Sequence, residues 1–136
     1  MLRMGFLACD FHPLLLVLAE HGEFQPLIEH LRVFAETGQS VDLHTDDRIY
    51  APDVSVRLVD RDGANVLKPG LSPLGGDPSV LEWALTRSQA DDFAEQIANL
   101  AASTGPAGSV TLACDALNEV RVVVSYGEWD DDFLTA

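Results

Sequence analysis

Between residues 81 and 124 the spacing of apolar side chains changes twice, and this change constrains the fold more than any other feature of the chain. Leu81, Trp83 and Leu85 alternate with other residues, as in a half-buried strand. The next apolar residues recur with helical spacing, and two further alternating runs follow them. This half of the chain is therefore expected to form a strand, a helix and two consecutive strands.

The predicted helix has a start signal and a stop signal. Thr86 and Gln89 have the spacing of a capping box, in which each side chain bonds the backbone amide of the other residue. Gly105 and Pro106 follow the last periodic residue and end the pattern. Residues 115–118 supply the turn of a hairpin between the two strands after the helix. The face expected to be buried consists of Ala90, Phe93, Ala94, Ile97, Leu100 and Ala101.

The first 40 residues are expected to form a helical pair. Asp10 is a candidate N-cap for a helix over residues 10–21, and a second helix is expected over residues 24–37, with Gly38 at its C-terminal cap. The first helix would carry five consecutive apolar residues, Leu14–Leu18. Because such a helix is apolar nearly all round, it must be buried inside the domain or against a second copy of the chain, in a homodimer.

The middle of the chain combines one strand pattern with a long irregular stretch. Val54, Val56 and Leu58 alternate with polar residues and predict a strand, which a turn at residues 62–63 would join to residues 64–67 in a hairpin. Residues 68–79 are rich in proline and glycine and have no periodicity, so a connecting loop is expected there.

These elements predict an α+β fold. The expected architecture is a mostly antiparallel sheet of four to five strands with helices packed on one face. We expect a single domain over residues 1–136, with the helical pair in residues 1–40 and the sheet with one long helix in residues 41–136. The hydrophobic content of 47% is sufficient for a core of ordinary size.

Charge limits the classes of partner. The formal net charge is -14, from 22 acidic and 8 basic residues. Half of the acidic residues lie after residue 68, where Arg87 and Arg121 are the basic residues. A negative field of this size repels nucleic acid and anionic membranes and favours encounter with a cationic partner.

The C-terminal part of the chain mixes acidic and aromatic side chains directly after a predicted buried strand. Aromatic rings supply contact area in protein interfaces, and carboxylates steer a basic partner. The candidate partner-binding residues are Tyr126, Glu128, Trp129, Asp130, Asp131, Asp132 and Phe133. The alternative is a solvated acidic tail whose rings pack back onto the domain.

A second polar cluster offers an enzymatic alternative. His44, Asp46 and Asp47 precede Tyr50, and in an extended segment His44 and Asp46 would point to the same side. A histidine paired with a carboxylate can move protons or bind metal, so a small hydrolase or metal-dependent enzyme is the competing hypothesis.

The sequence predicts no cofactor, no metal and no catalytic residue of defined role, since the acids at 130–132 are contiguous rather than spaced as in a calcium loop. Cys9 and Cys114 lie in apolar contexts and favour a cytoplasmic protein. The leading hypothesis is a small acidic, non-enzymatic protein-binding domain, of the inhibitor, adaptor or immunity type. It is similar to small acidic bacterial immunity proteins in size and charge alone. A homodimeric structural component without a ligand is the third possibility.

Overall fold

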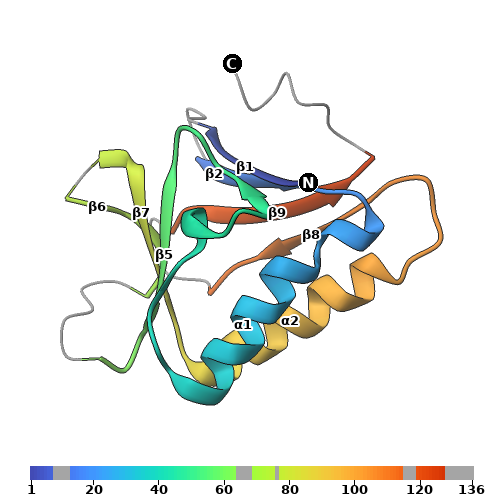
Figure 1. The fold of residues 1–136 in the computed structure, drawn as a ribbon. Coiled ribbons are helices and arrows are strands. Elements are labelled where there is room, and N and C mark those ends of the chain that lie inside the picture. Colours follow the sequence, from blue (N-terminus) through green and yellow to red (C-terminus); the bar gives the residue numbers. More distant parts are fainter. Residues whose placement is uncertain (8–12, 64–68, 76, 115–118, 128–136) are drawn as a thin grey trace.

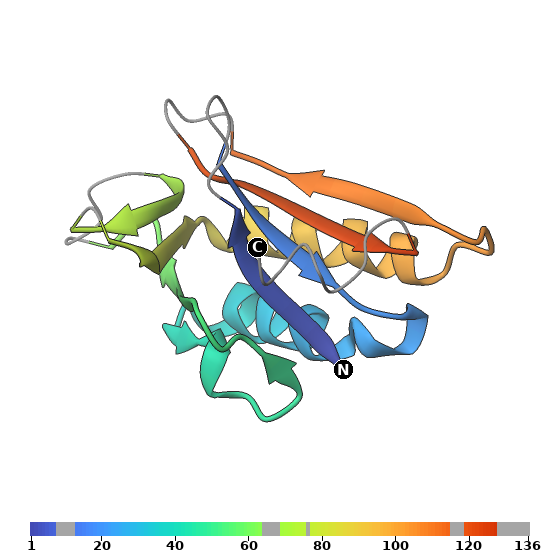
Figure 2. The ribbon, with the colours of Figure 1, turned by 90° about the horizontal axis from the view of Figure 1, so that it is seen from above.

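The computed structural model of the protein describes residues 1–7, 13–63, 69–75, 77–114 and 119–127. These residues form an α+β fold with two mixed sheets and two α-helices (Figures 1 and 2). The strands are β1 (Leu2–Leu7), β2 (Leu14–Leu18), β3 (Val41–Asp42), β4 (Ile49–Tyr50), β5 (Ser55–Asp60), β6 (Gly70–Leu74), β7 (Asp77–Leu85), β8 (Gly108–Leu112) and β9 (Arg121–Tyr126). The helices are α1 (Gln25–Thr37), α2 (Arg87–Ala101) and two short 3-10 helices, η1 (His21–Glu23) and η2 (Leu43–Thr45).

The larger sheet has five strands in the order β4-β1-β2-β9-β8. β2 is antiparallel to β1 and parallel to β9, and β8 and β9 form an antiparallel hairpin. The first strands of the chain therefore lie beside its last strands. The expected division into residues 1–40 and 41–136 is wrong, because one sheet draws strands from both parts.

The smaller sheet has four strands in the order β3-β5-β7-β6. β5 and β7 are parallel, whereas β3 pairs antiparallel with β5 and β6 pairs antiparallel with β7. Among the described residues one isolated bridge joins the two sheets, and in it the amide of Val120 donates to the carbonyl oxygen of Leu71 over 2.8 Å. Both sheets contribute to one continuous hydrophobic core.

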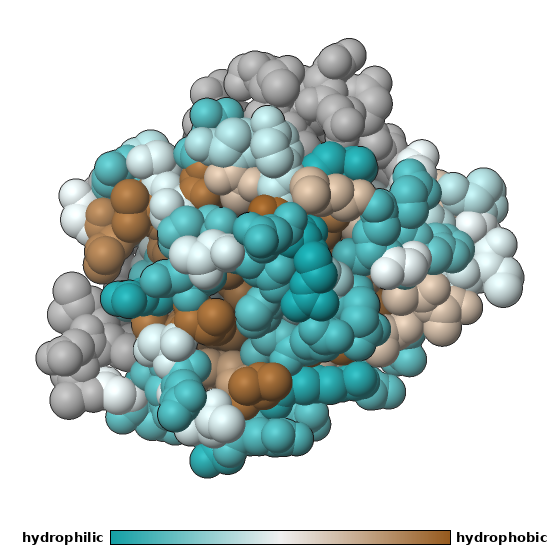
Figure 3. All heavy atoms as spheres, in the orientation of Figure 1, coloured by the Kyte–Doolittle hydropathy of each residue, from teal (hydrophilic) through white to brown (hydrophobic). Residues whose placement is uncertain are grey.

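Both α-helices lie on the same side of the five-stranded sheet, next to each other (Figures 1 and 2). Their apolar faces supply the core with residues such as Leu27, Leu31, Phe93 and Ile97. Within the described residues, no helix is long and apolar enough to cross a membrane. On the face shown in Figure 3, hydrophilic residues predominate, and hydrophobic residues form small separate patches.

The helix expected over residues 10–21 is wrong. Its apolar run Leu14–Leu18 is strand β2, which lies between β1 and β9, and His21 begins the short helix η1. A strand buried on both faces needs no alternation of polar and apolar residues, so an unbroken apolar run fits it as well as a buried helix. The described part of residues 1–40 therefore contains no helical pair, and α1 is its α-helix.

The expectations for the middle of the chain are also corrected. Residues 64–67, proposed as the partner strand of a hairpin, lie outside the described residues, and β5 instead has β3 and β7 as its neighbours. Residues 68–79 are not a loop without strands, since they contain β6 and the start of β7. β6 includes Pro73 and is an edge strand, which is where proline is tolerated in a sheet. Parallel pairs such as β5 and β7 make the sheets mixed rather than mostly antiparallel.

Several elements are confirmed. α1 ends at Gly38, whose φ of 69° is left-handed, and α2 begins with the Thr86 and Gln89 capping box, in which both hydrogen bonds are present. Phe93 and Ile97 of α2 share the core with the valines of β9. The hairpin of β8 and β9 pairs Val110 with Val124 as the alternating pattern indicates.

Candidate functional site

The end of β9, from which the acidic and aromatic segment continues, is firmly held in the core. The side chain of Tyr126 is 4% exposed, and its hydroxyl forms a hydrogen bond with the Ser103 hydroxyl. The imidazole of His21 packs edge to face on the Tyr126 ring, with 4.1 Å between ring centroids. Ser125 is fully buried, and its carbonyl oxygen accepts a hydrogen bond from the amide of Ala19.

Gly127 turns the chain at this point. Its φ is 74°, a left-handed value that favours glycine. A Cβ added to Gly127 would overlap the carbonyl oxygen of Pro106 and lie 3.1 Å from the Cα of Ala107. The direction in which the chain leaves β9 is therefore fixed by close contact with the loop before β8.

Of the seven predicted partner-binding residues, Tyr126 lies within the described residues, and its ring is a core side chain rather than an exposed one. The other six, Glu128, Trp129, Asp130, Asp131, Asp132 and Phe133, lie outside the described residues.

The second candidate site is centred on Asp46, which connects η2 to α1. One carboxylate oxygen, Oδ2, lies 2.7 Å from Nε2 of His30 and 2.9 Å from Nη2 of Arg48. The other, Oδ1, accepts hydrogen bonds from the amide and from Nε of Arg48. Nη1 of Arg48 in turn donates to Glu29 over 2.9 Å. The cluster therefore joins two residues of α1 to the segment between η2 and β4.

The electrostatics of this cluster favour the ionised carboxylate. Hydrogen bonds from Arg48 hold the pKa of Asp46 well below its usual value of 3.8, although partial burial acts in the opposite direction. The pKa of the Arg48 guanidinium is raised, chiefly by its hydrogen bonds to Asp46 and Glu29. An ionised Asp46 with all these partners is suited to hold the segment in place, because its carboxylate oxygens are already engaged.

The expected pairing of His44 with Asp46 is wrong. Leu43–Thr45 is a turn of 3-10 helix rather than an extended strand, so the alternation that would place the two side chains together does not apply. His44 is half-buried, and its buried Nδ1 atom has no hydrogen-bond partner within the described residues. The histidine that bonds Asp46 is His30, which lies 16 residues earlier in the chain. Only the fold brings it there, and no local pattern could have identified it.

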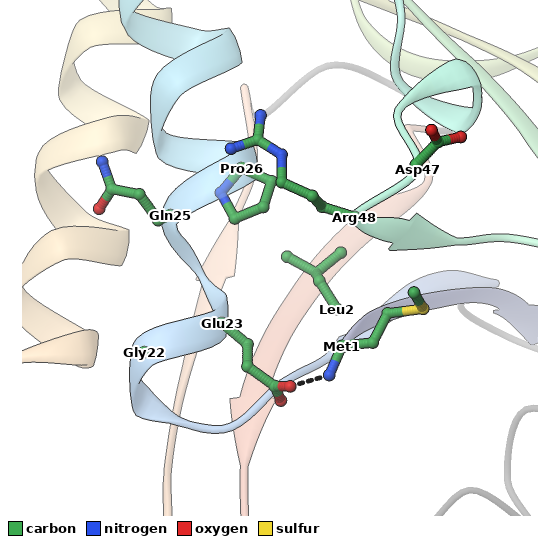
Figure 4. A pocket seen from close by; sticks show the side chains of 8 residues that line it. All are labelled: Met1, Leu2, Gly22, Glu23, Gln25, Pro26, Asp47 and Arg48. Carbon is green, nitrogen blue, oxygen red and sulfur yellow. Dashed lines mark ion pairs between the residues drawn. The ribbon is translucent and has the colours of Figure 1, made fainter.

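Asp47 lies at the edge of an open pocket of about 380 Å³ between the N-terminal strand and the start of α1. Its carboxylate points away from the Arg48 guanidinium, which extends past Pro26 (Figure 4). In the same view the ion pair of Glu23 with the Met1 amine closes the lower side of the pocket. The complete lining is Met1, Leu2, Gly22, Glu23, Gln25, Pro26, Asp47 and Arg48. His44, Asp46 and Asp47 thus do not converge on this pocket.

Metal binding was the other possibility for these side chains. Among residues 1–7, 13–63, 69–75, 77–114 and 119–127, no group of three or more histidine, cysteine, aspartate or glutamate side chains is placed to hold a metal ion.

Replacing Asp46 with asparagine should lower the free energy of unfolding by about 1–2 kcal/mol at neutral pH, because the variant loses charge-assisted hydrogen bonds to His30 and Arg48. A lowered folded-state pKa means that the unfolded chain takes up the proton first as the pH falls. The stabilisation is thus present above the usual pKa of 3.8 and is lost as the pH falls below it. Urea unfolding from pH 7 to pH 2 would measure this difference, which should shrink at low pH.

The exposed neighbour Asp47 provides the matched control. Asp47→Asn should leave the unfolding midpoint nearly unchanged across the same pH range. Equal effects of the two substitutions would contradict the structural role assigned to Asp46.

Comparison of the chain with protein-family models, with curated proteins and with solved structures finds no match.

Proposed function

We propose that this protein is a small acidic, non-enzymatic binding domain that holds a basic protein partner, as an inhibitor, adaptor or immunity-type protein does. The observation that carries the proposal is the position of the acidic and aromatic segment. The segment begins at Glu128, two residues after Tyr126, whose side chain is buried in the core. It contains four carboxylates, a tryptophan and Phe133. A segment attached to a rigid strand end reaches a partner from a defined place on the molecule.

The distribution of charge over the described surface supports a cationic partner. Arg32, Arg48 and Arg57 each form ion pairs with acidic side chains of the same chain. Arg87 donates to backbone carbonyl oxygens at the end of α1. Four of the eight basic residues are thus engaged within the molecule. The net charge of -14 makes the outward field negative.

Within this proposal the side chains of residues 128–133 have different roles. The carboxylates of Glu128, Asp130, Asp131 and Asp132 attract the partner over a distance and set the rate of association. Trp129 supplies the desolvated contact that holds the complex, since buried tryptophan is a frequent hot spot.

The two alternative functions have less support. The carboxylate of Asp46 forms hydrogen bonds with His30 and Arg48. This arrangement favours a structural role over that of an acid or base available to a substrate. The homodimer hypothesis depended on an apolar helix that a second copy of the chain would bury. Leu15 and Leu16 are instead fully buried side chains of the central strand β2. We also propose a cytoplasmic location, on the grounds that both cysteines lie in apolar stretches of sequence.

Changing Asp130, Asp131 and Asp132 together to asparagine should slow association with the partner and flatten its dependence on ionic strength, because these carboxylates act through long-range attraction. Trp129→Ala should mainly speed dissociation and cost about 2 kcal/mol or more of binding free energy. Surface plasmon resonance at low and high salt, with a partner captured from the source cells and then purified, would separate the two effects.

A suitable control is Asp53→Asn, which removes one exposed charge in the loop before β5. It should leave both rate constants near those of the wild type. If the triple variant and Trp129→Ala also bind at wild-type rates at every salt concentration, the segment is solvated surface and the proposed function is wrong.

A further inference from the structure

Each of the two sheets has two edge strands, and β8 differs from the other three. β3 and β4 have two residues each, and β6 contains Pro73, where its register with β7 also shifts. Short length, proline and irregular register all discourage an edge strand from pairing with another chain. β8 has five residues, contains neither proline nor a charged residue, and pairs with β9 without a shift. Among the described strands it is therefore the edge that is open to regular pairing.

The hydrogen bonds of β9 indicate which backbone groups of β8 point to the free edge. The carbonyl oxygen of Ser125 accepts a hydrogen bond from the amide directly after β2, so the backbone groups of Ser125 point toward β2. Successive residues of a strand direct these groups to alternate sides, so those of Val124 point toward its partner Val110 in β8. The N–H and C=O groups of Ser109 and Thr111 therefore point away from β9.

This edge is also accessible from solvent. The side chains of Ser109 and Thr111 are exposed, whereas Leu112 is buried. In Figure 2, β8, coloured orange, runs along one rim of the molecule, with α2 next to it. Among the described residues, no strand lies on the side of β8 that faces away from β9. An extended chain can therefore approach β8 from this side.

We propose that β8 pairs antiparallel with β8 of a second copy of the chain, so that two five-stranded sheets join across a two-fold axis. When Val110 lies opposite its own copy, Ser109 lies opposite Thr111 in both halves of the pairing. Ser109 and Thr111 then form the hydrogen-bonded pairs, in which both residues exchange their N–H···O bonds. The outward backbone groups of both residues are thus satisfied.

The side chains of β8 suit this register. A two-fold axis requires a surface that is complementary to itself. Serine opposite threonine is a favourable cross-strand pair, because the two hydroxyls can form a hydrogen bond. The two copies of Val110 form a non-hydrogen-bonded pair, in which side chains approach more closely, and β-branched side chains pack well there.

Charge favours a second copy of the chain as the occupant of this edge. Two chains that each carry a net charge of -14 repel each other. Residues 96–114, which include the end of α2 and all of β8, contain no charged side chain. Two copies that meet at β8 therefore approach where this repulsion is weakest. A strand of a basic partner, in contrast, finds no carboxylate on β8 to attract it.

The inference goes beyond the proposed function, because it requires no basic partner. It also differs from the homodimer expected from Leu14–Leu18, since β9 separates that strand from β8. Pairing along five residues makes a small interface, so we expect a weak dimer that dissociates on dilution.

Sedimentation velocity of the purified full chain, from low to high micromolar concentration, tests the association. We expect a monomer at low concentration and a dimer at high concentration. Ser109→Glu with Thr111→Glu should be monomeric throughout, because like charges would lie directly opposite each other. Ser109→Lys with Thr111→Lys reduces the net negative charge and should still be monomeric for the same reason.

The matched control is Ser109→Lys with Thr111→Glu, which keeps the net charge and places lysine opposite glutamate in both pairs. This variant should dimerise at least as well as the wild type. A mixture of the two-glutamate and two-lysine chains should likewise form a mixed dimer. Urea unfolding of each variant establishes that it is folded.

Amide hydrogen exchange measured by NMR locates the interface. At high concentration the amide protons of Ser109 and Thr111 should exchange slowly, and on dilution they should exchange faster. The amide proton of Val110, which points toward β9, should be protected at both concentrations.

A wild-type chain that stays monomeric at high micromolar concentration overturns the inference. A dimer in which the Ser109 and Thr111 amides exchange freely also overturns it, as does a dimer that both like-charged variants retain. A dimer with these amides protected, in a protein for which no basic partner is found, supports the inference and counts only against the proposed function.

Discussion

Replacing Phe93 with alanine should lower the free energy of unfolding by about 3–5 kcal/mol, through the lost transfer free energy of the ring and the cavity left behind. Phe93 is 4% exposed on the inner face of α2. Its ring stacks on Trp83 of β7, with 5.9 Å between centroids and 24° between the ring planes. The substitution therefore removes a contact between α2 and the smaller sheet, and thermal and urea unfolding would both measure it.

Val33 on α1 is the control, because 56% of it is exposed. Val33→Ala should change stability by less than about 0.5 kcal/mol. A Phe93→Ala protein that unfolds at the wild-type midpoint would contradict the placement of α2 on the core.

Gly127→Ala should cost about 2–3 kcal/mol, because the new Cβ combines a left-handed backbone with an overlap against backbone atoms of Pro106 and Ala107. Neither neighbour can withdraw by rotating a side chain. The strain must be relieved by moving the chain at the end of β9, so the substitution is expected to lower stability. Urea unfolding measures this effect.

The nearby Gly105 offers a control in the same region of the fold. A Cβ there would meet its nearest neighbour, the carbonyl oxygen of Ala107, at an ordinary 3.5 Å. Gly105→Ala should therefore be nearly neutral. Comparable losses from the two substitutions would show that the conformation of Gly127 is not the cause.

The elements that the sequence predicts correctly are those whose signals are local. The capping box at Thr86 and Gln89, the period of α2 and the alternation of β8 and β9 all lie within single elements or adjacent ones. The hydrogen bonds that cap a helix end and the period that buries one face of an element both depend on residues close together in the chain.

The errors arise where the cause is distant in sequence. Leu14–Leu18 carries no period, and its partner on one side, β9, lies more than 100 residues later. β5 and β7 pair in parallel although a long connection separates them, and no turn motif in the sequence predicts this pairing. The local helix signals around Asp10 were therefore the only ones available, and they were misleading.

The same distinction applies to the candidate sites. Asp46 was correctly selected as a residue with a histidine partner, but the partner is His30 rather than His44, because α1 packs beside η2. Tyr126 was selected for its place next to acidic residues, and its role in the structure is to hold the end of β9. Residue type was informative in both cases, whereas the contact depended on tertiary structure.

The most direct test of the central claim, that the acidic segment binds a basic protein, is quantitative affinity capture from the source cells. The wild-type chain, the triple asparagine variant at residues 130–132 and Asp53→Asn are immobilised in equal amounts, and the retained proteins are quantified by mass spectrometry. We predict one basic protein that the wild type and Asp53→Asn retain equally and the triple variant loses. Equal retention by all three chains, or no protein enriched on the wild type, would contradict the claim.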